Sequence, residues 1–159
     1  MNRPYDAAIL GVGSAHGDDA IGWRVIDQLS AQATPRIQLR QLANPVEIVD
    51  YLDRANEVHV VDAAIRMNQN QSVQRVAYSS ISNQESIDAA ARGTHGIGVL
   101  QALQLAESLG LPTDHVSIWL TRGESCDPLA EPTNTAIESA GLCASAIVQE
   151  LRSTRIVTR

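Results

Sequence analysis

Three short polar segments contain residue types that could perform chemistry together. The first is the glycine-rich stretch 11–19, which ends in the adjacent acids Asp18 and Asp19. The second is Asp62, which closes an apolar run, and the third is His95, which lies between two glycines. Two carboxylates and one imidazole provide oxygen and nitrogen donors that suit Ni²⁺ or Zn²⁺ better than Ca²⁺ or Mg²⁺. Three protein ligands with an open coordination position are typical of catalytic metal sites.

Each of these residues also has a purely structural explanation. Asp18 and Asp19 lie at the predicted start of a helix. Taken alone, such an acid pair most often caps the helix or stabilises its dipole. Asp62 differs, because an ionised carboxylate at the end of an apolar strand requires partners or a metal. His95 alone is equally compatible with a ligand and an ordinary loop histidine. His16 lies in the same loop as the acid pair and could act as an auxiliary ligand or as a gate. Asp18 could also act as an auxiliary ligand.

The overall composition excludes several functional classes. The chain of 159 residues has a net charge of −6, and all 12 of its basic residues are arginines. This charge disfavours nucleic acids and anionic membranes as partners. Without lysine there is no phosphate-binding Gly-Lys-[Ser/Thr] loop, and Asp18-Asp19 would repel the pyrophosphate of a dinucleotide. No apolar run approaches the ~20 residues that span a bilayer.

The two cysteines favour neither a disulfide framework nor nucleophilic catalysis. Cys126 lies beside Glu124 and Asp127, acids that should raise the pKa of its thiol, and Cys143 falls in a predicted core helix. The sequence also lacks the Gly-x-Ser-x-Gly elbow of a serine hydrolase. Because the N-terminus does not resemble a signal peptide, we expect a reducing, cytoplasmic location.

An alternation of strands and helices is predicted to position these residues. Strands are expected over 6–12, 37–42, 58–64, 73–78 and 116–120, and helices over 20–32, 45–55, 99–109 and 132–151. Residues 79–96 are expected to form a loop or a short helix. This order predicts a single α/β domain over 1–159, with a frayed tail at 152–159. Its mostly parallel, twisted sheet of about five strands, with 58–64 at the centre, should be covered by helices on both faces.

In such a sheet the functional groups collect at the carboxyl ends of the strands. The three polar segments all fall at such ends or in the loops that follow them, so a carboxylate of the Asp18-Asp19 pair, Asp62 and His95 are expected to meet. His59 precedes Asp62 on the same strand and should pack on the opposite face. His115, at the start of a strand, is expected at the surface.

Taken together, the three motifs resemble those of the [NiFe]-hydrogenase maturation endopeptidases. They are Gly-Val-Gly-Ser-x-x-Gly-Asp-Asp-Ala-Ile-Gly over 11–22, Val-Val-Asp-Ala over 60–63 and Thr-His-Gly-Ile-Gly over 94–98. Ser14 stands where this family usually has asparagine, and His16 adds a polar group to the same loop. The motifs occur in the family's order, and the resemblance covers most of the chain.

The resemblance implies a small α/β endopeptidase that removes the C-terminal extension of a hydrogenase large subunit after nickel has been inserted. It implies that Asp19, Asp62 and His95 contact this nickel. The metal would be supplied by the substrate, so the free enzyme need not hold any. The implied partner is the large subunit, and we expect a monomer because no large apolar surface is evident.

Two other functions stay open at this stage. A non-catalytic nickel-sensing chaperone or binding module could use the same scaffold, and the altered residues Ser14 and His16 would then mark its divergence. A self-sufficient zinc hydrolase would need tight metal binding by the isolated protein. The zinc enzyme ranks last, because the proposed ligand set contains only one histidine.

Overall fold

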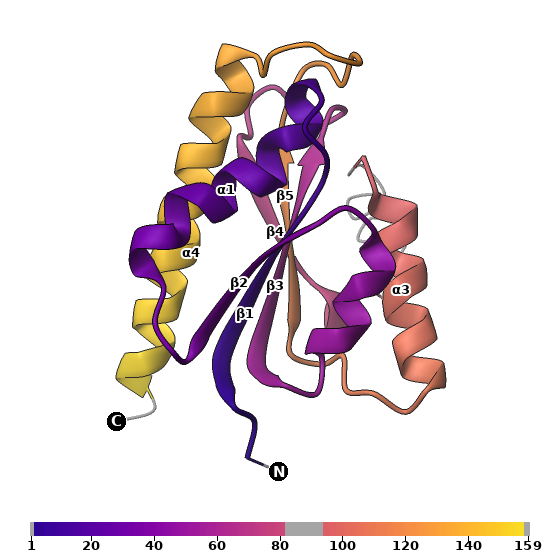
Figure 1. The fold of residues 1–159 in the computed structure, drawn as a ribbon, viewed down its shortest axis with the longest axis vertical. Helices are drawn as coiled ribbons and strands as arrows, with labels where there is room; N and C mark the ends of the chain where they lie inside the picture. Colours follow the sequence, from indigo (N-terminus) through magenta and orange to yellow (C-terminus); the bar gives the residue numbers. More distant parts are fainter. Residues whose placement is uncertain (1, 82–93, 158–159) are drawn as a thin grey trace.

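A five-stranded β-sheet forms the centre of the computed structural model, which describes residues 2–81 and 94–157 (Figure 1). The strands are β1 (Tyr5–Val12), β2 (Ile37–Leu42), β3 (Ala55–Ala64), β4 (Val73–Ala77) and β5 (Val116–Arg122). Their order across the sheet is β2-β1-β3-β5-β4, and only β4 runs antiparallel to its neighbour. The predicted sheet, with its central third strand, is therefore confirmed.

Helices cover both faces of the sheet (Figure 1). Helices α1 (Ile21–Leu29) and α4 (Asn134–Val157) pack on one face, whereas α3 (Gly96–Ser108) and the 3₁₀ helix η3 (Pro45–Tyr51) pack on the other. Each face has its own apolar core. No helix in the described part of the chain is both long and apolar enough to cross a membrane.

Strand β3 is buried on both faces, which explains its continuous apolar sequence. Val58 and Val60 contribute to the core under α3, and Val61 and Ala63 contribute to the core under α1 and α4. Asp62 lies two residues after Val60 on the same strand, so its side chain is on the same face of the sheet, the one covered by α3. A carboxylate is thus placed where the strand ends and α3 begins.

Two glycines of the first motif let α1 lie directly against β1. A Cβ atom added to Gly11 would overlap the carbonyl oxygen of Gly22, and one added to Gly22 would come within 2.5 Å of the carbonyl oxygen of Val12. Only residues without side chains permit so close an approach. This packing fixes the turn that precedes α1, and with it Asp19, above the end of the sheet.

Two local predictions differ from the structure, and a third lies partly outside the described residues. The helix expected over 45–55 is a 3₁₀ helix that begins with an Asn44–Glu47 capping box and ends at Tyr51. It cannot continue, because Ala55 already pairs with β1. The frayed tail expected from residue 152 is wrong for 152–157, which continue α4. Part of the expected loop at 79–96, namely residues 82–93, lies outside the described residues.

The extension of α4 has a physical basis. Leu151 packs against the core beneath α4. Arg75 of β4 forms an ion pair with Glu150 at 2.7 Å, which ties the end of the helix to the edge of the sheet. Helical order therefore persists beyond the last residue of the apolar stripe that the sequence displays.

Candidate functional site

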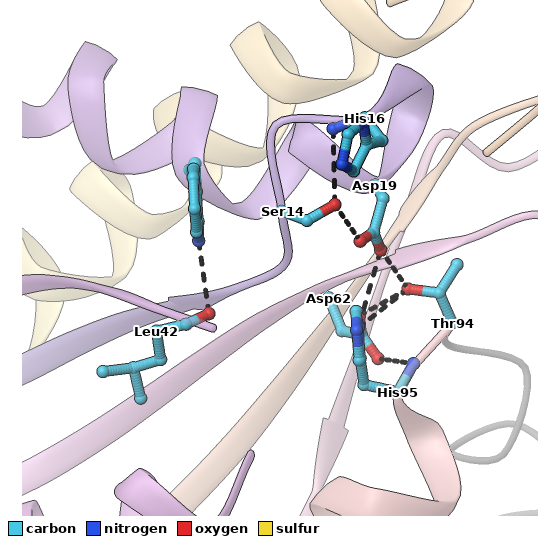
Figure 2. Close-up of polar contacts among 8 residues, drawn as sticks. Ser14, His16, Asp19, Leu42, Asp62, Thr94 and His95 are labelled. Atoms are coloured by element: carbon cyan, nitrogen blue, oxygen red, sulfur yellow. Dashed lines mark hydrogen bonds and ion pairs between the residues drawn. The ribbon is translucent and has the colours of Figure 1, made fainter. Parts of the chain in front are cut away.

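The three predicted site residues meet at the carboxyl ends of the strands (Figure 2). Asp62 lies near the end of β3, and its side chain is only 1% exposed. One of its carboxylate oxygens, Oδ2, accepts the backbone N–H of His95 at 3.0 Å. The other, Oδ1, lies 3.2 Å from Nδ1 of the His95 ring. The start of α3 is thereby attached to the end of β3.

Asp19 reaches the same place from a different segment of the chain. It belongs to η1 (Gly17–Ala20), a single 3₁₀ turn that precedes α1. The hydroxyl of Ser14 donates to Oδ2 of Asp19 at 2.6 Å, which leaves Oδ1 directed at the other site residues. Oδ1 lies 3.6 Å from Nδ1 of His95. Ser14, which differs from the family pattern, therefore orients one of the predicted ligands.

Thr94 is a site residue to which sequence reasoning gave no role. Its hydroxyl oxygen lies 3.0 Å from each of three atoms, namely Oδ1 of Asp19, Oδ1 of Asp62 and Nδ1 of His95 (Figure 2). Its backbone N–H donates to the carbonyl oxygen of Ala63 at 2.6 Å. In the sequence it stands next to His95 and at the start of the motif over 94–98, and neither position shows where its hydroxyl lies.

The pKa values of Asp62 and His95 are both raised, for different reasons. Burial raises the pKa of Asp62, and this effect outweighs the hydrogen bonds and the charge of His95 and the hydrogen bond from Thr94. The hydrogen bond to Asp62 raises the pKa of His95 more than burial lowers it, and the charges of Asp62 and Asp19 act in the same direction. The negative charges of the cluster therefore favour the binding of a positively charged species, either a proton or a metal cation.

Asp18 lies beside Asp19 in sequence but serves a different part of the structure. Its carboxylate accepts the backbone N–H groups of Glu124, Ser125 and Thr133 and the hydroxyl of Thr133, at 2.6–3.1 Å. Burial alone would raise the pKa of Asp18, but these hydrogen bonds together lower it by more than burial raises it. The net result is a pKa below the ordinary value. Both carboxylate oxygens are directed to the loop at 123–133. Asp18 thus anchors this loop and is not brought into the cluster of Asp62 and His95.

His16 also holds the loop at 123–133. Its ring Nδ1 accepts the backbone N–H of Leu129 at 3.2 Å, and its own backbone N–H donates to the Ser14 hydroxyl at 3.3 Å. Leu129 is 88% exposed and has a φ of 62°. The side chain of His16 supports this loop, and its carbonyl oxygen accepts the backbone N–H of Asp19 at 3.0 Å.

Cys126 lies beside the cluster, because its thiol is hydrogen-bonded to the backbone of Asp19. Burial, followed by the charges of Asp19, Asp18 and Asp62, raises the pKa of Cys126 to about 11. The expected direction is confirmed, although Glu124 and Asp127, the acids named from sequence, are not those responsible.

The two other histidines lie away from the cluster. His59 is buried on the opposite face, as predicted, where Nε1–H of Trp119 donates to its Nδ1 at 3.1 Å. The surface position predicted for His115 is wrong, because its side chain is only 10% exposed.

The donor atoms in the cluster have the right chemistry for a borderline divalent ion, but they are not yet arranged as its ligands. Two carboxylate oxygens and one imidazole nitrogen suit Ni²⁺ or Zn²⁺. Within residues 2–81 and 94–157, no group of three His, Cys, Asp or Glu side chains has the geometry to hold a metal. Asp19, Asp62 and His95 instead surround the hydroxyl of Thr94.

Comparison with known proteins identifies solved structures of the same fold. No family model and no curated protein matches the sequence. The hydrogenase maturating endopeptidase HybD from E. coli is 19% identical over 93% of each chain, with a TM-score of 0.67. An endopeptidase from Escherichia coli, solved in solution, has the same identity and coverage and a TM-score of 0.71. The [NiFe] hydrogenase maturation protease HycI from Thermococcus kodakarensis is 18% identical, covers 96% of this chain and 95% of its own, and has a TM-score of 0.65.

Proposed function

We propose that this protein is an endopeptidase that removes the C-terminal extension of a [NiFe]-hydrogenase large subunit after nickel has been inserted. One observation carries the proposal. Asp19, Asp62 and His95 come from three separate segments and converge on one point at the carboxyl ends of the strands. The shared fold of the hydrogenase maturation proteases and the three sequence motifs support the same activity.

The substrate's nickel is the feature that these three side chains recognise. Two carboxylates and one imidazole attract a divalent cation, and the net charge of −6 strengthens the attraction. His95 and Asp19 are 25% and 14% exposed, whereas Asp62 is 1% exposed. A metal carried on another protein would therefore meet His95 and Asp19 first and Asp62 last.

Cleavage of the peptide then needs a group that takes a proton from the attacking water. We assign this role to Asp62, whose carboxylate is buried and is held in place by the backbone N–H of His95. Asp19, oriented by Ser14, positions the cationic centre beside the scissile bond. We propose that a monomer in the cytoplasm performs this reaction on the large subunit alone, without a resident metal of its own.

The test is to incubate the purified protein with a nickel-loaded large-subunit precursor and to measure the intact mass of the precursor. We expect the mass to fall by that of the C-terminal extension. Asp62→Asn and His95→Ala should each slow this trimming by about 100-fold or more, because each removes a group that contacts the reacting centre. Asp53→Asn, which changes an exposed acid in a turn, is the matched control and should trim normally.

Three results would contradict the proposal in different ways. Normal trimming by both site variants would exclude the proposed residues. Stable binding of the precursor without any loss of mass would favour the chaperone or binding module. Tight Zn²⁺ binding together with activity on small peptides would favour a self-sufficient zinc hydrolase.

A further inference from the structure

The hydroxyl of Thr94 lies within hydrogen-bond distance of all three proposed ligands. Its oxygen lies 3.0 Å from Oδ1 of Asp19, Oδ1 of Asp62 and Nδ1 of His95 (Figure 2). In a site of this type a divalent metal would lie about 2.0–2.2 Å from the same kinds of donor atom. The hydroxyl and a metal ion would therefore compete for the same three donor atoms.

The hydrogen-bonding capacity of a hydroxyl explains how it can hold this cluster together. A threonine hydroxyl has one proton to donate and two lone pairs that accept. Here it donates to either Asp19 or Asp62, and it can accept from a protonated His95 ring. Two carboxylates that would otherwise repel each other are thereby bridged by one neutral group.

The position of Thr94 does not depend on its hydroxyl. Its backbone N–H donates to the carbonyl oxygen of Ala63 at 2.6 Å, and the next backbone N–H, that of His95, donates to Asp62. These two main-chain bonds fasten the start of α3 to the end of β3. Thr94 is also exposed, so its side chain is free to rotate about the Cα–Cβ bond.

We propose that Thr94 is a positioning residue whose hydroxyl occupies the three donor atoms until the metal arrives. In the metal-free protein it keeps Asp19, Asp62 and His95 converged; when a divalent cation binds between the three donor atoms, the hydroxyl releases them and rotates away. This inference rests on the proposed function, because it takes the same three side chains as the ligands of the substrate's nickel.

The proposal predicts the direction of an effect on metal affinity. The bonds of the hydroxyl stabilise only the metal-free state, so their removal should strengthen metal binding. Thr94→Val, which keeps the shape of the side chain, should bind Ni²⁺ about three- to tenfold more tightly than the wild-type protein. Thr94→Ser keeps the hydroxyl and should bind within about twofold of wild type.

The measurement is a calorimetric titration of the metal-free, full-length proteins with Ni²⁺, with the affinity for a nickel-loaded precursor as the second readout. Thr34→Val, which changes an exposed threonine ahead of β2 at the opposite end of the sheet, is the control. Weaker binding by Thr94→Val would overturn the proposal, because the hydroxyl would then support the metal-bound state. Equal binding by Thr94→Val, Thr94→Ser and wild type would overturn it as well.

The same experiment separates this inference from the proposed function. Asp62→Asn is titrated in parallel, and it should lose Ni²⁺ and precursor binding if Asp62 is a ligand. If Asp62→Asn binds both as well as wild type, the ligand set is wrong and the proposed function fails. If binding depends on Asp62 but Thr94→Val does not bind more tightly, only the inference about Thr94 fails.

Discussion

Asp18 and Asp62 are both fully buried, yet the two regions that hold them treat the carboxylate in opposite ways. Around Asp18, three backbone N–H groups and the hydroxyl of Thr133 donate to the carboxylate. Around Asp62, the donors are one backbone N–H, a hydroxyl that is shared with Asp19, and the titratable ring of His95. The pKa of Asp18 is lowered, and that of Asp62 is raised.

This difference teaches how a structural carboxylate and a candidate functional one can be distinguished within one protein. The donors to Asp18 are permanent, because a backbone N–H cannot leave, so the charge is fixed and the loop at 123–133 is fixed with it. The charge on Asp62 depends on protons that His95 and Thr94 can move or withdraw. A site that must accept a cation needs the second arrangement.

The largest expected effect is a loss of stability when the anchor at Asp18 is removed. Asp18→Ala leaves three partly buried backbone N–H groups without their acceptor, and each unsatisfied group costs about 1–3 kcal/mol. We expect the free energy of unfolding to fall by about 3 kcal/mol or more, measured by urea denaturation. Asp53→Ala, at an exposed position, should change it by less than about 0.5 kcal/mol. A similar small change in Asp18→Ala would refute the anchoring role.

The second effect is smaller and tests the other half of the comparison. Asp62→Asn removes a buried charge whose hydrogen bonds do not fully offset its burial, and the amide oxygen can still accept the N–H of His95. The free energy of unfolding should therefore change by less than about 1 kcal/mol, measured by the same denaturation. A loss as large as that of Asp18→Ala would mean that Asp62 is also a structural anchor.

Much of the fold follows from the sequence, because each of its main features has a local cause. The apolar run at 58–64 predicts a strand buried on both faces, and the structure places it at the centre of the sheet. The carboxyl-end rule for parallel sheets brings Asp19, Asp62 and His95 together, since it depends only on which residues follow which strands. These predictions needed the pattern of the chain and no knowledge of distant contacts.

What the sequence did not reveal depends on contacts between distant residues. The donors to Asp18 lie 106 to 115 positions away, so nothing near it indicates an anchor. The hydroxyl of Thr94 reaches Asp19 across 75 positions. The helix expected over 45–55 has a suitable apolar stripe, but the pairing of Ala55 with Tyr5 ends it early. The local pattern of apolar residues predicts the helices and strands. Tertiary contacts determine where these elements end and which polar groups they contact.

The third prediction concerns the pH dependence of stability, where the two carboxylates should act in opposite directions. Asp18 has a folded pKa below the ordinary 3.8, so its contribution is present above that pH and is lost as the pH falls through the folded pKa. Asp62 has a folded pKa above 3.8, so its stabilising contribution is present when it is protonated and is lost as the pH rises through the folded pKa.

Urea denaturation from about pH 6 to about pH 3 tests this expectation. The stability advantage of the wild type over Asp18→Asn should shrink as the solution becomes more acidic. The stability of the wild type relative to Asp62→Asn should rise over the same range. Parallel curves for the two variants would show that both carboxylates have the same environment, and the comparison would fail.

The smallest expected effect is on the reactivity of Cys126, whose thiol pKa is raised by burial and by the charges of Asp19, Asp18 and Asp62. Burial is the main reason why its pKa is about 11, and the charge of Asp19 contributes more than that of Asp62. Alkylation at about pH 8 follows the thiolate fraction, so Asp19→Asn should accelerate it by about two- to fivefold, and Asp62→Asn by less. Cys143 is fully buried with a pKa of about 12, so the labelling reports Cys126 alone. Because burial persists in both variants, neither should react as fast as an exposed thiol, and equal rates in the two would show that Cys126 does not distinguish the acids.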